Sequence, residues 1–181
     1  MREKKSSFSR TKKKYIKFLR KQEIHGQPFL NKINQLKDFY LPISEQIYSN
    51  YLINKNCLII GLSGAQGTGK TTISKILKII LKTKFKLNVV NFSIDDFYKT
   101  LKQRKKMSQD IHELFLTRGV PGTHDTYLLK KKLQKILKRK FSPIKLPRFD
   151  KAADDRLPKQ KWVKIKKKPD IVIFEGWCVG A

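Results

Sequence analysis

The chain has 181 residues, of which 39% are hydrophobic and 10% aromatic. That length suits one domain, and the apolar fraction excludes a disordered polyelectrolyte. The formal net charge of +28 is typical of proteins that bind nucleic acids. However, the charge comes from 34 lysines and only 8 arginines, and it is spread over single residues and short runs. We therefore interpret most of it as solvated surface charge and expect no nucleic-acid partner.

Two further classes of protein are disfavoured. Cys57 and Cys178 lie far apart in apolar stretches, which suits neither a disulfide framework nor a metal site. No apolar run approaches the length of a membrane span, and the basic N-terminus lacks the apolar segment of a signal peptide. We expect a cytoplasmic protein with no membrane partner.

The first 55 residues divide into two parts. Residues 1–28 are mostly Lys, Arg, Ser and Gln, and we predict a flexible basic tail, with one short basic helix as the alternative. Residues 29–55 carry apolar side chains at helical spacing on both sides of Pro42 and are predicted as a helical prelude.

Residues 56–181 are predicted as the core of the protein. A short apolar strand, residues 57–62, runs into a glycine-rich loop and an amphipathic helix, and a second strand covers residues 88–94. A third strand covers residues 170–174. This β-α-β order predicts an α/β fold, a three-layer P-loop NTPase sandwich with a mainly parallel sheet. Three strands are fewer than such a sheet usually has, so we expect the sheet to be incomplete toward the C-terminus.

Two more helices are predicted between the second and third strands. Ser108 is expected to cap the first, which would run through Phe115. Asp125 or Thr126 is expected to cap the second, which would run through Leu137.

The loop after the first strand matches the pattern GxxxxGK[ST] in the context that the pattern requires, with a buried strand before it and a helix after it. Its glycines let backbone N–H groups point inward at a polyphosphate, and the helix N-terminus adds partial positive charge. Lys70 would then reach the β- and γ-phosphates of ATP, and the Thr71 hydroxyl would bind Mg²⁺. A glycine-rich turn with an exposed lysine is the alternative. The predicted ATP-binding residues are Gly64, Ala65, Gln66, Gly67, Thr68, Gly69, Lys70, Thr71 and Thr72.

Acidic residues follow the second and third strands. In a parallel sheet, Asp95 and Asp96 would emerge at the carboxyl edge beside the phosphate loop. A carboxylate there could accept the proton of a substrate hydroxyl as that oxygen attacks the γ-phosphate, and a pair of helix N-cap residues is the alternative. Glu175 ends the third strand and is predicted to hold Mg²⁺ directly or through water, with a surface glutamate in a turn as the alternative.

Residues 118–125 and 147–156 are rich in Gly, Pro and charged residues and are predicted as substrate-binding loops. Their cationic side chains could pair with a carboxylate or phosphate on the second substrate, and His124 is the one histidine in a suitable position. For each of these residues a loop ion pair or cap is the alternative. The predicted substrate-binding residues are Asp96, Tyr98, Arg118, His124, Arg148, Lys151 and Arg156.

The ordered motifs of the core are GLSGAQGTGKTT, SIDDFY, TRGVPGTHD, PRFDKAADDR and IVIFEGWCVGA. Together they resemble the glycerate kinase type of small-molecule P-loop kinase, which is related to uridine kinase, phosphoribulokinase and bacterial pantothenate kinase. The resemblance runs from about Cys57 to the last residue. It implies phosphoryl transfer from ATP to D-glycerate with Mg²⁺, and it puts Asp95 in the position of the family's proposed base.

The sequence departs from that family in two places. Chloroplast members have a longer spacer between the FDK and DR parts than residues 152–154 provide, so the chain resembles a bacterial or fungal form. In the family, the chain continues past FEGW with another strand, an adenine-contacting segment and an arginine-bearing lid. Because this sequence stops at Ala181, we expect an N-terminal portion that by itself binds nucleotide weakly and has no measurable glycerate kinase activity.

Three other functions stay open as alternatives. A nucleoside or pantothenate kinase-like enzyme would use another acceptor, but a nucleoside needs aromatic stacking, whereas the carboxylate of glycerate suits Arg148, Lys151 and Arg156. A nucleic-acid-associated ATPase is motivated by the net charge of +28 and would bind DNA or RNA with a steep salt dependence. An inactive truncated product is motivated by the abrupt end of the chain.

Overall fold

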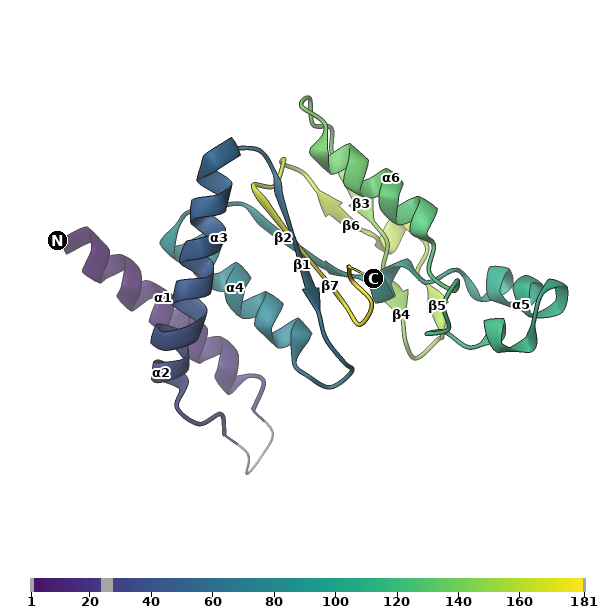
Figure 1. Cartoon of the computed structure of the whole chain (residues 1–181), viewed down its shortest axis with the longest axis horizontal. Helices are drawn as coiled ribbons and strands as arrows, with labels where there is room; N and C mark the ends of the chain where they lie inside the picture. The colour runs from purple at the N-terminus through teal and green to yellow at the C-terminus, as the bar shows by residue number, and fades with distance from the viewer. Residues whose placement is uncertain (1, 24–27, 181) are drawn as a thin grey trace. The chain divides into compact units, whose positions relative to one another are not determined.

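The computed structural model describes residues 2–23 and 28–180 (Figure 1). The chain forms two compact units. Unit 1 consists of Met1–Asn91 and Pro169–Gly180, and unit 2 consists of Phe92–Lys168. The predicted tail, prelude and core do not coincide with this division, because the N-terminal helices pack on the first helix of the predicted core.

Unit 1 contains the phosphate-loop motif. Its helices are α1 (Arg2–Arg20), α2 (Lys32–Gln35), the π-helix η1 (Leu36–Tyr40), α3 (Leu41–Asn54) and α4 (Lys70–Lys84). Its strands are β1 (Leu58–Ser63), β7 (Ile171–Gly176) and β2 (Val89–Ser93), whose last two residues belong to unit 2.

The sheet of unit 1 has the strand order β1-β7-β2, so the last strand in the sequence lies in the middle. The strand β7 pairs in parallel with β1, from Leu58 opposite Ile171 to Ser63 opposite Gly176. All six residues of β7 are buried, as expected for a parallel strand covered on both faces. The predicted α/β fold with a parallel sheet is therefore confirmed.

A hydrophobic core joins this sheet to α4 and α3. Leu77 and Leu81 of α4 pack with Ile171 and Ile173 of β7 and with Ile47 of α3. These α4 residues recur every four positions, so one side of the helix faces the sheet while its lysines take the other side. The periodicity that predicted an amphipathic helix here is confirmed.

The predicted tail forms helix α1, so the prediction of a flexible segment is wrong for residues 2–20. Thr11, Tyr15 and Leu19 repeat every four residues and are at most 1% exposed. The hydroxyls of Thr11 and Thr83 lie 2.8 Å apart in a buried hydrogen bond that ties α1 to α4. Figure 1 shows α1 and α3 beside α4. Residues 24–27 of the predicted tail lie outside the described residues.

Unit 2 consists of short elements. Its helices are η2 (Ile94–Phe97), α5 (Leu101–Asp110), η3 (Glu113–Leu116), α6 (Thr126–Leu137) and η4 (Lys159–Lys161). Its strands are β3 (Ile144–Leu146), β4 (Phe149–Asp150), β5 (Asp155–Arg156) and β6 (Val163–Ile165). The strands form two antiparallel pairs, β3 with β6 and β4 with β5, which were not predicted from the sequence.

The two predicted helix starts have different outcomes. Asp125 caps α6 as predicted, because its Oδ1 accepts from the backbone N–H of Leu128 at 2.9 Å. Ser108 does not begin a helix. It lies near the end of α5, which starts earlier with a capping box between Thr100 and Gln103.

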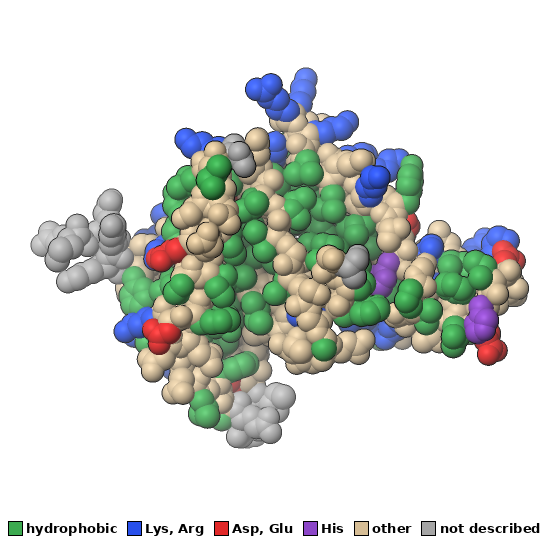
Figure 2. Space-filling model, in the orientation of Figure 1, with side chains coloured by type: hydrophobic (Ala, Val, Ile, Leu, Met, Phe, Trp, Pro, Cys, Tyr) green, Lys and Arg blue, Asp and Glu red, His purple; other side chains and the backbone are tan. Residues whose placement is uncertain are grey.

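On the face shown in Figure 2, the described basic side chains do not form one continuous patch. Figure 2 shows lysine and arginine side chains in several separate groups on the face in view, as their distribution along the sequence predicts. Within residues 2–23 and 28–180, none of the helices combines the length and the apolar character that crossing a membrane requires. Cys57 and Cys178 are not joined in a disulfide.

We predict that Leu19→Ala lowers the free energy of unfolding by about 2–5 kcal/mol, because it leaves a cavity between α1 and α4. Lys17→Ala, on the exposed side of the same helix, is the control and should change it by less than about 0.5 kcal/mol. Urea unfolding followed by circular dichroism measures both variants. Equal stability of the Leu19→Ala variant and the unsubstituted chain would show that α1 does not pack on α4.

Candidate functional site

The phosphate loop joins β1 to α4 and is largely exposed. Gly67 and Gly69 have φ angles of 79° and 82°, a left-handed conformation that favours glycine. The carbonyl oxygen of Ala65 organises the loop, because it accepts from the Thr68 hydroxyl at 2.8 Å and from Lys70 Nζ at 2.6 Å. The cation of Lys70 therefore lies over the loop that would hold a polyphosphate.

The N-terminus of α4 is suited to binding an anion. The helix has 15 residues, its first turn carries no acidic side chain, and no side chain caps it. Its first N–H groups and its partial positive charge can therefore act on a phosphate.

Glu175 and Thr71 lie together at the end of the sheet. Thr71 Oγ1 donates to Glu175 Oε1 at 2.9 Å, and Glu175 is 7% exposed. Because Glu175 is paired with Leu62 in the β7-β1 ladder, it is part of a strand and the alternative of a turn residue at the surface is wrong.

This pair fits the chemistry of Mg²⁺. The ion prefers oxygen ligands and is usually held by one or two carboxylates, with phosphate and water oxygens completing the shell. Within the described part of the chain, no cluster of three or more His, Cys, Asp and Glu side chains is placed to hold a metal alone. The hydroxyl of Thr71 and the carboxylate of Glu175 are thus the groups suited to a nucleotide-bound Mg²⁺.

The two aspartates predicted after the second strand lie in unit 2, within η2, and each has its own cation. Asp95 Oδ2 accepts from Lys151 Nζ at 3.0 Å, and Asp96 Oδ2 accepts from Arg148 Nη1 at 2.9 Å. The N-cap of η2 is Ser93, so neither aspartate is the cap residue. Burial raises the pKa of Asp96, while the guanidinium of Arg148 acts in the opposite direction.

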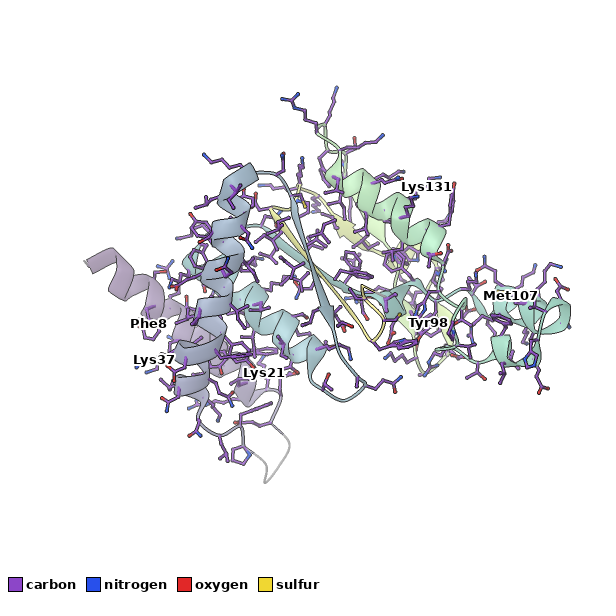
Figure 3. All side chains as sticks on the ribbon, in the orientation of Figure 1. Phe8, Lys21, Lys37, Tyr98, Met107 and Lys131 are labelled. Atoms are coloured by element: carbon purple, nitrogen blue, oxygen red, sulfur yellow. The ribbon has the colours of Figure 1, made fainter. Side chains whose placement is uncertain are left out.

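Tyr98 and His124 form a buried pair in unit 2, and Figure 3 labels Tyr98. Their rings stack with centroids 4.2 Å apart, and a β-bridge joins their backbones. His124 is 6% exposed, and its Nε2 has no hydrogen-bond partner among the residues that the structure describes. Burial lowers the pKa of His124, against the attraction of the Asp95 carboxylate.

The remaining predicted cations have structural partners. Arg156 donates to the carbonyl oxygen of Tyr98 at 2.9 Å and to Asp125 Oδ2 at 3.2 Å, which favours the alternative of a loop ion pair. Arg118 donates to the Lys151 carbonyl oxygen at 3.2 Å and pairs with Asp154.

Sequence reasoning missed Arg104, whose side chain is completely buried. It stands in a short basic run with Lys105 and Lys106, and the sequence alone indicates solvated surface charge for such runs. The residue type was the available signal, because lysines outnumber arginines by 34 to 8 in this chain. A buried cation that needs several fixed hydrogen bonds favours the guanidinium fork over an ammonium group.

The strand before the loop, β1, is partly exposed rather than buried as predicted. A phosphate loop between a parallel strand and a helix, with a carboxylate at the end of the adjacent parallel strand, defines the P-loop nucleotide-binding class. Within this class, the model of the phosphoribulokinase/uridine kinase family matches residues 59–179. The chain belongs to that family.

Several relatives make the comparison more specific. The chain is 36% identical over 129 residues to the uncharacterized kinase mug58 of Schizosaccharomyces pombe, covering 67% of this chain and 46% of that protein. It is 32% identical over 131 residues to the chloroplastic D-glycerate 3-kinase of Arabidopsis thaliana, covering 68% and 28%. A pantothenate kinase of Lactococcus lactis is 26% identical over 161 residues, covering 80% and 50%.

A solved structure shows the same fold. The D-glycerate 3-kinase of Cryptococcus neoformans matches with a TM-score of 0.67 and 29% identity, over 76% of this chain and 51% of that one. The chain spans about half the length of the first curated relatives that it matches, 46% and 47%.

We predict that Lys70→Ala abolishes tight binding of Mg·ATP without unfolding the chain, because Thr68 still donates to the Ala65 carbonyl oxygen but the phosphate charge is then uncompensated. Lys75→Ala, on the exposed side of α4, is the control. Titration with a fluorescent ATP analogue measures the affinity, and circular dichroism checks the fold. Unchanged affinity of Lys70→Ala would overturn the phosphate-loop assignment.

We also predict that His124 makes the protein less stable in acid. Since burial lowers the pKa of His124, the unfolded chain binds the proton more tightly than the folded chain. The stability contribution of His124 is therefore present above the ordinary histidine pKa of about 6.5 and is lost as the pH falls below it. Unfolding in urea at about pH 7.5 and about pH 5.5 should show this loss, and His124→Gln should remove it.

An identical pH dependence in the His124→Gln variant and the unsubstituted chain would contradict a neutral buried imidazole.

Proposed function

We propose that the protein phosphorylates a small hydroxy acid with ATP and Mg²⁺, and that D-glycerate is the acceptor. The observation that carries this proposal is the similarity to D-glycerate 3-kinases in both sequence and structure, at 32% and 29% identity. Both units contribute residues with the chemistry that this reaction needs.

The nucleotide side belongs to unit 1. The loop N–H groups, the α4 N-terminus and Lys70 would bind the phosphates of ATP, and Thr71 and Glu175 would hold Mg²⁺. When bound, the ion neutralises charge on the transferred phosphoryl group. Phosphoryl transfer requires little covalent chemistry from the protein, so positioning and charge are the main contributions of these residues.

The acceptor side belongs to unit 2. Asp95 would accept the proton of the attacking hydroxyl, because its carboxylate is partly exposed, whereas that of Asp96 is buried against Arg148. The exposed ammonium of Lys151 and the guanidinium of Arg148 would attract the carboxylate of glycerate. The buried, neutral imidazole of His124 offers one further hydrogen bond.

Tyr98, the aromatic side chain among the predicted substrate-binding residues, favours an acid over a nucleoside. Tyr98 is 4% exposed, and its ring is already stacked on His124 and in edge contact with Phe149 at 5.3 Å. It therefore has no free face on which a nucleobase could stack.

Calorimetric titration with D-glycerate, pantothenate and uridine, each in the presence of a non-hydrolysable ATP analogue, tests the choice of acceptor. Binding of D-glycerate alone among the three is the expected result, and a charge-neutral amide of glycerate should bind more weakly because it lacks the carboxylate. Preferential binding of pantothenate or uridine would show that glycerate is not the acceptor.

In a form of the protein that turns over, we predict that Asp95→Asn lowers the rate of phosphoryl transfer by at least about 10²-fold, since a positioned base contributes that much. Affinity for ATP should change little. Asp96→Asn is the matched variant and should have a smaller effect on the rate. ADP release in a coupled assay gives both rates, and the reverse order would move the base from Asp95 to Asp96.

A further inference from the structure

Arg104 is a fully buried cation with an almost complete set of hydrogen bonds. Its Nη2 donates to Asp154 Oδ2 at 2.9 Å and to the carbonyl oxygen of the same residue. Its Nη1 donates to the carbonyl oxygen of Leu116, and its Nε donates to that of Lys99 at 3.4 Å. One side chain of α5 thus joins η3, the segment between η2 and α5, and the turn between β4 and β5.

Asp154 is held from a second side by Arg118. The two carboxylate oxygens of Asp154 divide between the two arginines, Oδ2 to Arg104 and Oδ1 to Arg118. Arg118 also donates to the carbonyl oxygen of Lys151, at the opposite end of the same four-residue turn. Both guanidinium groups lie over the ring of Phe149, at 5.9 Å and 5.8 Å from its centroid.

The backbone of this turn is under strain that the two arginines compensate. Asp154 has a φ of 51°, a left-handed conformation that costs free energy for a residue with a side chain. Inside the turn, Asp150 Oδ1 accepts from the N–H groups of Ala152 and Ala153 at 2.9 Å and 3.2 Å. In this conformation of the turn, Lys151 Nζ lies 3.0 Å from Asp95 Oδ2.

We propose that Arg104, together with Asp154 and Arg118, is a positioning device that holds Lys151 at Asp95 for binding of the acceptor. This inference rests on the proposed function, because it gives Lys151 a role toward the acceptor substrate. Arg104 does not touch the acceptor and acts only through the turn. A lysine could not replace it, because a single ammonium group does not present the fork that reaches Leu116 and Asp154 together.

The test compares Arg104→Lys with Lys105→Arg, which makes the reciprocal exchange at the neighbouring exposed position of α5. Arg104→Lys should weaken binding of D-glycerate at least about tenfold, the scale of one lost hydrogen bond to a charged group. It should leave the affinity for an ATP analogue unchanged, since the phosphate loop lies in unit 1. Lys105→Arg should change neither affinity.

Asp154→Gly is the second variant, and it keeps the test valid if Arg104→Lys does not fold. Glycine adopts the left-handed backbone of position 154 without strain, so only the carboxylate is lost. It should weaken D-glycerate binding as Arg104→Lys does. In a Lys151→Met background, neither substitution should weaken it further, because both act through Lys151. The proposal would be overturned if Arg104→Lys and Asp154→Gly bind D-glycerate as tightly as Lys105→Arg does. It would also be overturned if either substitution weakens D-glycerate binding just as much in the Lys151→Met background.

Hydrogen exchange separates this inference from the proposed function. If the unsubstituted chain does not bind D-glycerate, the proposed acceptor is wrong, and the positioning device is then judged on the amides of Ala152 and Ala153. These should exchange faster in Arg104→Lys than in Lys105→Arg, while the amides of β3 and β6 in the same unit keep their protection. Equal exchange at the turn in both variants would show that Arg104 does not hold it.

Discussion

The parallel pairing of β7 with β1 is the constraint on which unit 1 depends. It brings the last strand of the sequence beside the first and sets Glu175 opposite Leu62, one residue before the end of each strand. A slip of one residue would turn Glu175 to the other face of the sheet and break its hydrogen bond to Thr71. The buried apolar residues of β7 and the α4 face that packs on them make such a slip unfavourable.

The conformation of unit 2 depends instead on hydrogen bonds and ion pairs made by arginine side chains. In a chain with 34 lysines, four of the 8 arginines, at positions 104, 118, 148 and 156, make fixed contacts in this unit to carboxylates or carbonyl oxygens. Most lysines are exposed, and pairs such as that of Lys106 with Asp110 contribute little to stability in water. Arginines make the fixed contacts because a planar guanidinium group satisfies several acceptors at once, whereas the ammonium group of lysine is easily solvated.

Local patterns in the sequence predicted the features that depend on local physics. The phosphate loop, the α4 periodicity, the Asp125 cap and the apolar β7 strand can each be recognised within about 15 residues. The burial of α1 could not be predicted in this way, because the face that carries Tyr15 is buried only by packing on α4, which is distant in the sequence. The many lysines of α1 indicate a solvated segment when they are considered alone. The pairing of Asp95 with Lys151 spans 56 residues, and strands of two residues such as β4 and β5 have no periodicity to detect.

Magnesium dependence of nucleotide binding tests the β1-β7 arrangement most directly. The affinity of the chain for an ATP analogue is measured with and without Mg²⁺, in the unsubstituted protein, in Thr71→Val, in Glu175→Gln and in the double variant. If the Thr71 hydroxyl and the Glu175 carboxylate bind the same ion, Mg²⁺ should tighten binding of the ATP analogue only in the unsubstituted protein. The double variant should then lose no more affinity than either single variant. A full magnesium effect in Glu175→Gln would contradict this account.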